Sequence, residues 1–139
     1  KFLWIGEGRY FENIKKEADN RKINKYIIFV GNSNKVEEFY SAMDIFILPS
    51  LYEGNPISCI EAQTNGLKCI ISNKITTRCN ITGQVVFLKI EDTIEWVKKL
   101  EEMKNECNHT SDLEKIIQSG FSVKDNARKL EEIYDELEK

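Results

Sequence analysis

The sequence predicts an α/β fold, a Rossmann-like parallel sheet flanked by helices. Short apolar runs alternate along the chain with segments whose apolar residues recur at helical spacing. The apolar runs are continuous and do not alternate with polar residues, which is typical of strands buried on both faces of a parallel sheet. Alternation of strand and helix favours a doubly wound arrangement with right-handed crossovers. We therefore expect residues 1–139 to form a single domain.

Five apolar runs define the expected strands. They span residues 2–5, 26–30, 45–48, 67–72 and 85–88. Gly6 and Gly31 end the first two runs, and Pro49 ends the third. Glycine and proline interrupt strands, because glycine adopts turn conformations freely and proline has no amide hydrogen to donate.

Helices are expected between these strands and over the rest of the chain. They span residues 10–20, 34–42, 56–66, 93–107, 111–118 and 123–137. Asn34 followed by Glu37 resembles a capping box. Asn55 is the expected N-cap of the next helix, with Pro56 at its first helical position and Gly66 at its end.

The composition is that of an ordinary globular domain. Hydrophobic residues make up 41% of the chain and charged residues 31%. The formal net charge is −3 and the basic residues are scattered, so neither nucleic acid nor an anionic membrane is an indicated partner. No apolar run approaches the roughly 20 residues that span a bilayer, and we expect no signal peptide in this stretch. The chain begins in a strand at Lys1, so we expect a piece of a longer protein, and the unpaired cysteines favour a cytoplasmic one.

Cysteine and histidine are too scattered to predict a metal site. The four cysteines are Cys59, Cys69, Cys79 and Cys107, and no two form a C-x-x-C pair. His109 is the single histidine, whereas zinc needs about four ligands at short spacing. Cys59 and Cys69 lie in apolar contexts and are expected to be small buried hydrophobes. We expect reduced thiols and no bound metal.

Two strand ends carry candidate ligand-binding turns, because open parallel sheets bind ligands beyond the carboxyl ends of their strands. Gly6 and Gly8 surround one residue after the first strand and would let a ligand approach the backbone, although the full G-x-G-x-x-G pattern is absent. Gly31, Asn32 and Ser33 follow the second strand and could contact the edge of a base. A tight turn and a surface loop are equally open interpretations.

The segment 49–56 is the strongest candidate, because it links a buried strand to a helix. The amides of Ile57 and Ser58 are expected to be free at the helix start, where the helix dipole favours phosphate. Gly54 allows a ligand to approach the backbone closely. Glu53 would accept hydrogen bonds from ligand hydroxyls, and Glu61 stands less than ~10 Å from the start of the helix. The alternatives are that Glu53 caps its own backbone in the loop and that Glu61 is a solvated helix residue.

These residues resemble the signature of family 4, or group 1, glycosyltransferases of the GT-B fold. The matching residues are Ser50-Leu51-Tyr52-Glu53-Gly54-Asn55-Pro56, then Ile60-Glu61-Ala62-Gln63 and Gly66. Phe29-Val30-Gly31, Tyr40, Ala42, Asp44 and Ile45 are similar to the preceding run, and Ile5-Gly6-Glu7-Gly8 to an earlier strand end. With Trp96 and Tyr134, the likeness is greatest to members that build capsular or exopolysaccharides.

The resemblance implies the donor-binding C-terminal domain of a retaining, metal-independent hexosyltransferase with no cofactor. Glu53 would be the catalytic residue, contacting the donor sugar, and Glu61 would bind the ribose. The backbone of residues 54–57 would hold the diphosphate and residues 31–33 would lie against the base. The complete set of implied donor-binding residues is Gly6, Gly8, Gly31, Asn32, Ser33, Ser50, Glu53, Gly54, Asn55, Pro56, Ile57 and Glu61.

The implied partners are a nucleotide sugar and a glycan or lipid-linked acceptor. The acceptor would bind a missing N-terminal domain, and two basic diphosphate contacts of the family lie upstream, so the isolated chain is expected to be inactive. Only the full-length enzyme would contact the inner face of the plasma membrane. The stretch 72–77 departs from the family's Gly-Gly turn; Lys74 or Arg78 either supplies charge there or is an ordinary surface residue.

Three interpretations of the function remain open. The first is the donor half of a retaining hexosyltransferase, whose base could be uracil or guanine and whose sugar could be glucose, galactose, mannose or an N-acetyl sugar. The second is a sugar-nucleotide epimerase or phosphorylase relative, which would share the fold. A non-catalytic nucleotide-binding domain is the third reading, and joint retention of Glu53, Gly54 and Glu61 disfavours it.

Overall fold

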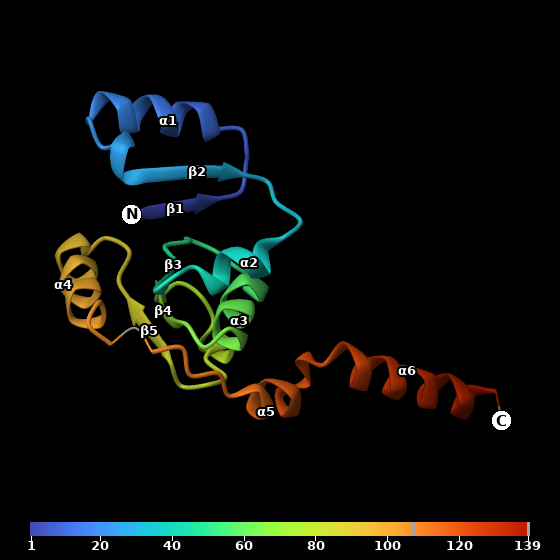
Figure 1. Cartoon of the computed structure of the whole chain (residues 1–139). Coiled ribbons are helices and arrows are strands. Elements are labelled where there is room, and N and C mark those ends of the chain that lie inside the picture. Colours follow the sequence, from blue (N-terminus) through green and yellow to red (C-terminus); the bar gives the residue numbers. More distant parts are fainter. Residues whose placement is uncertain (107, 139) are drawn as a thin grey trace. The chain divides into compact units, whose positions relative to one another are not determined.

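The structure, a computed structural model, describes residues 1–106 and 108–138 (Figure 1). The chain divides into two compact units, Lys1–Val36 and Glu37–Lys139. The described strands pair in two parallel sheets, one of two strands and one of three. The predicted α/β class with parallel strands is confirmed.

The first unit is a strand–helix–strand element. Its parts are β1 (Phe2–Ile5), α1 (Phe11–Asn20), a 3₁₀ turn (Asn24–Tyr26) and β2 (Ile27–Gly31). β1 and β2 are parallel, and α1 lies along one face of the pair (Figure 1). The ring of Phe11 packs edge-on against Phe29, with centroids 5.8 Å apart. Tyr26 belongs to the turn, so the second strand starts one residue later than predicted.

The second unit is built on a three-stranded sheet. Its elements, with α2 starting at the boundary, are α2 (Val36–Ser41), β3 (Ile45–Leu48), α3 (Ile57–Thr64), β4 (Lys68–Ser72), a 3₁₀ turn (Thr77–Cys79), β5 (Val85–Leu88), α4 (Thr93–Met103), α5 (Leu113–Ile116), a wider turn (Ile117–Phe121) and α6 (Val123–Leu137). The strand order is β3-β4-β5, all parallel. Helices α2 and α3 lie on one side of this sheet and α4 on the other (Figure 1).

The core of the second unit gathers around the central strand β4. Leu67, Ile70 and Ile71 are fully buried. Ile70 packs with Leu88 and Trp96 on the α4 side, because a central parallel strand is covered on both faces. The edge strands β3 and β5 are only partly buried along much of their length, so the predicted burial on both faces holds for β4.

Element ends differ from the prediction more than element types do. The first α2 residue is Val36, two positions after the predicted cap Asn34. Helix α4 ends at Met103, short of the predicted Cys107, which lies outside the described residues. The predicted helix 111–118 is one turn, Leu113–Ile116, followed by a wider turn in which Gly120 takes a positive φ. Within residues 1–106 and 108–138, no helix is long and apolar enough to cross a membrane.

Candidate functional site

Glu53 lies in the loop after β3 and is held by a nearby hydroxyl. Ser50 Oγ donates a hydrogen bond to Glu53 Oε1 at 2.8 Å, and both side chains are partly buried. The second carboxylate oxygen can still accept from a ligand hydroxyl. Leu51 and Tyr52, between them, are 71% and 84% exposed, so this loop presents an apolar surface to its surroundings.

The start of α3 offers fewer free amides than the sequence predicts. Pro56, and not Asn55, occupies the N-cap. The amide of Ile57, predicted to be free, donates to the carbonyl of Asn55 at 2.9 Å, so that prediction is wrong. The reason is the turn at Pro56, which folds the Asn55 carbonyl back onto the helix. Within the described part of the chain the Ser58 amide has no acceptor and can still bind an anion.

Gly54 lies in an open part of the loop. A Cβ at this position would meet no atom within 4 Å. No protein atom therefore requires glycine here. Its predicted role, close approach of a ligand to the backbone, stays a prediction.

Glu61 lies on the exposed face of α3 and is bound by a tyrosine of α2. Tyr40 Oη donates to Glu61 Oε2 at 3.0 Å. The Tyr40 side chain is buried, and burial followed by the Glu61 hydrogen bond raises its pKa far above the ordinary value. The phenol is therefore protonated throughout the physiological range, and it acts as a donor to the carboxylate.

A buried amide fastens the other face of α3 to the chain after β4. Gln63 is fully buried. Its Nε2 donates to the carbonyls of Cys59 and Cys79, at 3.1 and 2.7 Å. Its Oε1 accepts from the amides of Ile81 and Thr82, at 3.0 and 3.1 Å. This network fixes the orientation of the helix that carries Glu61.

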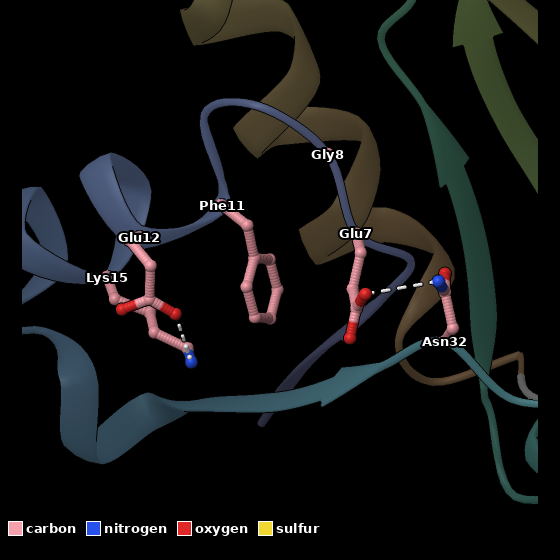
Figure 2. A pocket seen from close by; sticks show the side chains of 6 residues that line it. All are labelled: Glu7, Gly8, Phe11, Glu12, Lys15 and Asn32. Atoms are coloured by element: carbon pink, nitrogen blue, oxygen red, sulfur yellow. Dashed lines mark hydrogen bonds and ion pairs between the residues drawn. The ribbon is translucent and has the colours of Figure 1, made fainter.

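The first unit has its own pocket at the carboxyl ends of β1 and β2. It is lined by Glu7, Gly8, Phe11, Glu12, Lys15 and Asn32 (Figure 2). Asn32 Nδ2 donates to Glu7 Oε2 at 3.1 Å, which links the two predicted turns. Figure 2 shows the ring of Phe11 between this pair and the Glu12–Lys15 ion pair. Two carboxylates and one ammonium suit an uncharged group such as a base or a ribose better than a diphosphate.

Both glycines that end strands β1 and β2 have positive φ, 116° at Gly6 and 76° at Gly31. The Gly6 amide donates to the Gly31 carbonyl at 2.8 Å, and a Cβ on Gly31 would lie 2.9 Å from Glu7 Oε1. These glycines therefore shape the pocket, as the sequence predicts for tight turns. Gly8 lines the pocket, and Ser33 Oγ accepts from the Lys35 amide in the following loop.

The turn after β4 emerges at the same sheet edge as the loop that carries Glu53, because β3 and β4 are parallel neighbours. Ser72 is buried, and its Oγ accepts from the Lys74 amide at 3.1 Å. Lys74 and Arg78 are exposed, and neither forms an ion pair with another described residue. The positive charge of Lys74, two residues after β4, is therefore available at this edge.

Three of the cysteines lie in the core of the second unit. Cys59, Cys69 and Cys79 are buried and free. Burial raises the pKa of the Cys79 thiol to about 12, so it stays protonated at neutral pH. Among the residues that the structure describes, no group of three or more His, Cys, Asp or Glu side chains is arranged to hold a metal ion.

Parallel strands with candidate binding surfaces at their carboxyl ends are typical of α/β proteins that bind ligands there. The family model described as Glycosyl transferases group 1 matches residues 1–120. The chain therefore belongs to the group 1 glycosyltransferases.

Similar proteins agree with this assignment. A Bacillus subtilis (strain 168) protein named as a glycosyltransferase, EpsF, is 29% identical over 97% of this chain and 36% of its own length. The UDP-Gal:alpha-D-GlcNAc-diphosphoundecaprenol alpha-1,3-galactosyltransferase of Escherichia coli is 26% identical over 98% of this chain and 37% of its own length. The chain thus spans little more than a third of these relatives.

A solved structure supports the fold. The crystal structure of WaaG, a glycosyltransferase involved in lipopolysaccharide biosynthesis, matches with a TM-score of 0.60 at 14% identity. The match covers 76% of this chain and 30% of WaaG. This likeness confirms the predicted α/β fold of the GT-B class.

The sequence assigns no role to three residues that the structure places at the site or on α3. Tyr40 holds Glu61. Glu7, the middle residue of a Gly-x-Gly turn, pairs with Asn32. Gln63 could have been found, because it is a polar residue one helical turn after Cys59, on the apolar face of the helix.

Proposed function

We propose that this chain is the donor-binding domain of a retaining hexosyltransferase. It would bind a nucleotide diphospho-sugar whose hexosyl unit passes to a glycan or lipid-linked acceptor, in capsular or exopolysaccharide synthesis. The observation that carries the proposal is the pair Glu53 and Glu61. One precedes α3 and the other lies in its second turn, and a hydroxyl orients each carboxylate.

The electrostatics of the second unit fit a diphosphate at the start of α3. The Ser58 amide and the positive end of the helix dipole attract an anion there. Lys74, on the same edge of the sheet, adds an exposed positive charge. These groups would stabilise the leaving diphosphate as its charge develops, which is an electrostatic contribution to catalysis. Glu53 would then accept hydrogen bonds from the hydroxyls of the transferred sugar.

The names of the relatives support the class of donor and acceptor. The Escherichia coli relative is named for transfer from UDP-Gal to a diphosphoundecaprenol-linked sugar. Another relative, 39% identical over half of this chain, is a Vi polysaccharide biosynthesis protein of Salmonella typhi. We propose the same general chemistry here, with the acceptor bound by parts of a longer enzyme.

Replacing the two glutamates separately tests the proposal, because each is assigned to a different part of the donor. Glu53→Gln should weaken the binding of a nucleotide sugar by about 1–3 kcal/mol and leave the binding of the bare nucleoside diphosphate unchanged. Glu61→Gln should weaken the binding of both ligands equally, since both contain ribose. For the isolated chain we expect a dissociation constant near millimolar, a binding free energy of about −4 kcal/mol, and NMR titration can measure binding in this range. UDP, GDP and their sugar derivatives are the probes.

Glu131→Gln is the matched control, because Glu131 is an exposed glutamate of α6. It should change neither affinity. A Glu53→Gln variant that loses as much affinity for the bare diphosphate as for the sugar nucleotide would refute the assignment of Glu53. Equal affinity of the wild-type chain for nucleoside mono- and diphosphates would favour a non-catalytic nucleotide-binding domain.

We also propose that donor binding needs no metal. Adding a chelator should leave the affinity for the nucleotide sugar unchanged in the same titration, because charge neutralisation is assigned to the α3 terminus and basic side chains. Manganese is the control addition. Affinity that falls with chelator and returns with manganese would contradict this part of the proposal.

A further inference from the structure

Tyr40 and Glu61 form a contact between two helices that are separated in sequence. Tyr40, on α2, is 4% exposed, and its ring packs against Phe46 with centroids 6.0 Å apart. Its hydroxyl reaches Glu61 Oε2 at 3.0 Å, while Glu61 itself lies on the exposed face of α3. A rigid buried group thus holds one oxygen of a solvent-facing carboxylate.

We propose that Tyr40 is a positioning residue for Glu61, which it holds in the rotamer that presents Oε1 to the ribose hydroxyls of the donor. This inference rests on the proposed function, because it takes the ribose to be the ligand of Glu61. Tyr40 does not touch the ligand. It acts through the carboxylate alone.

The physical basis is preorganisation. An exposed glutamate samples several rotamers, and binding a ligand through it costs about 0.5–1.5 kcal/mol of lost side-chain freedom. Tyr40 removes that cost in advance, since its ring is already fixed by packing. The direction of the hydrogen bond is unambiguous: a protonated phenol donates and a carboxylate only accepts. Oε2 is thereby engaged, and Oε1 stays available for a second donor.

A purely structural role for Tyr40 makes a different prediction. If the hydroxyl only satisfied its own hydrogen bond at the edge of the core, its loss would lower stability without affecting any ligand selectively. The distinguishing measurement is therefore the affinity for a ligand with ribose compared with one without it. Inorganic pyrophosphate carries the diphosphate alone and provides that comparison.

The experiment is a double-mutant cycle of Tyr40→Phe and Glu61→Gln, with NMR titration of UDP, GDP and pyrophosphate into the 139-residue chain. Tyr40→Phe keeps the packed ring and should weaken nucleoside diphosphate binding about 3- to 10-fold while pyrophosphate binding is unchanged. The double variant should bind no more weakly than Glu61→Gln alone, because the carboxylate through which Tyr40 acts is already gone. Tyr134→Phe, at an exposed tyrosine of α6, is the control and should be silent.

The outcomes separate the two hypotheses. If Glu61→Gln leaves nucleoside diphosphate affinity unchanged, the ribose role of Glu61 fails and the positioning role fails with it. If Glu61→Gln weakens binding but Tyr40→Phe is silent, or if the two losses add in full, only the positioning role is overturned. The ¹³Cζ resonance of Tyr40 gives a readout without ligand: it should shift in Glu61→Gln and stay in place in Glu131→Gln. An unmoved resonance would show that the contact is absent in solution.

Discussion

Replacing Gln63 with leucine is expected to lower the free energy of unfolding by about 3–5 kcal/mol. Leucine has a similar volume and leaves the packing of α3 nearly intact, so the loss is one of hydrogen bonds. The amides of Ile81 and Thr82 and the carbonyl of Cys79 would lose their side-chain partner. An unsatisfied buried polar group costs about 1–3 kcal/mol, and leucine at the fully buried position 63 offers no hydrogen bond to replace those of glutamine.

Urea denaturation followed by circular dichroism measures this effect. Gln118→Leu is the matched control, because Gln118 is exposed and should change stability by less than about 0.5 kcal/mol. Gln63→Glu is a second test, since it keeps the shape but places a charge among the same groups. A loss below about 1 kcal/mol for Gln63→Leu would show that the network is not a main tie between α3 and the chain after β4.

Gly66→Ala is expected to cost about 3 kcal/mol, from two separate causes. Gly66 has a φ of +78°, which a residue with a Cβ adopts only under strain. A Cβ would also lie 2.7 Å from the Thr110 amide nitrogen and 2.8 Å from that of Ser111. These are backbone atoms, and the Thr110 amide donates to the Gly66 carbonyl at 3.2 Å, so they cannot move away cheaply.

Gly83→Ala isolates the first cause, the strain of a positive φ. Gly83 has a similar φ of +84°, but a Cβ there would meet nothing within 4 Å. It should therefore cost only the conformational part, about 1 kcal/mol. The difference between the two variants in urea denaturation measures the close approach of residues 109–111 to the end of α3. Equal losses would mean that this approach is absent in solution.

The sequence alone determined the class of fold and the positions of the elements. Continuous apolar runs predicted strands β1, β3 and β5 to the residue. Gly66 was expected to end its helix and does so in the positive φ region. These features depend on neighbours in the chain: a run of β-branched and aromatic residues, and a glycine free of Cβ strain. The motif around Glu53 likewise indicates the family from the sequence alone.

The local sequence does not predict the start of α3 correctly, because two neighbouring residues both suit that position. Asn55 and Pro56 both suit the start of a helix, and the structure places Pro56 at the cap and engages the Ile57 amide with Asn55. Which arrangement forms depends on how the loop leaves β3, and that geometry is set by the sheet. The predicted helix 111–118 is also shorter in the structure, where α5 ends at Ile116 and a wider turn that contains Gly120 follows.

The tertiary structure alone decided which side chains meet. The Tyr40–Glu61 bond joins residues 21 positions apart, and the Glu7–Asn32 bond joins residues 25 apart. Periodicity can assign each of these side chains to a face of its own element, but it carries no information on the distance between elements. That distance follows from packing: the Tyr40 ring against Phe46 places the phenol at Glu61, and the pairing of β1 with β2 brings their terminal turns together.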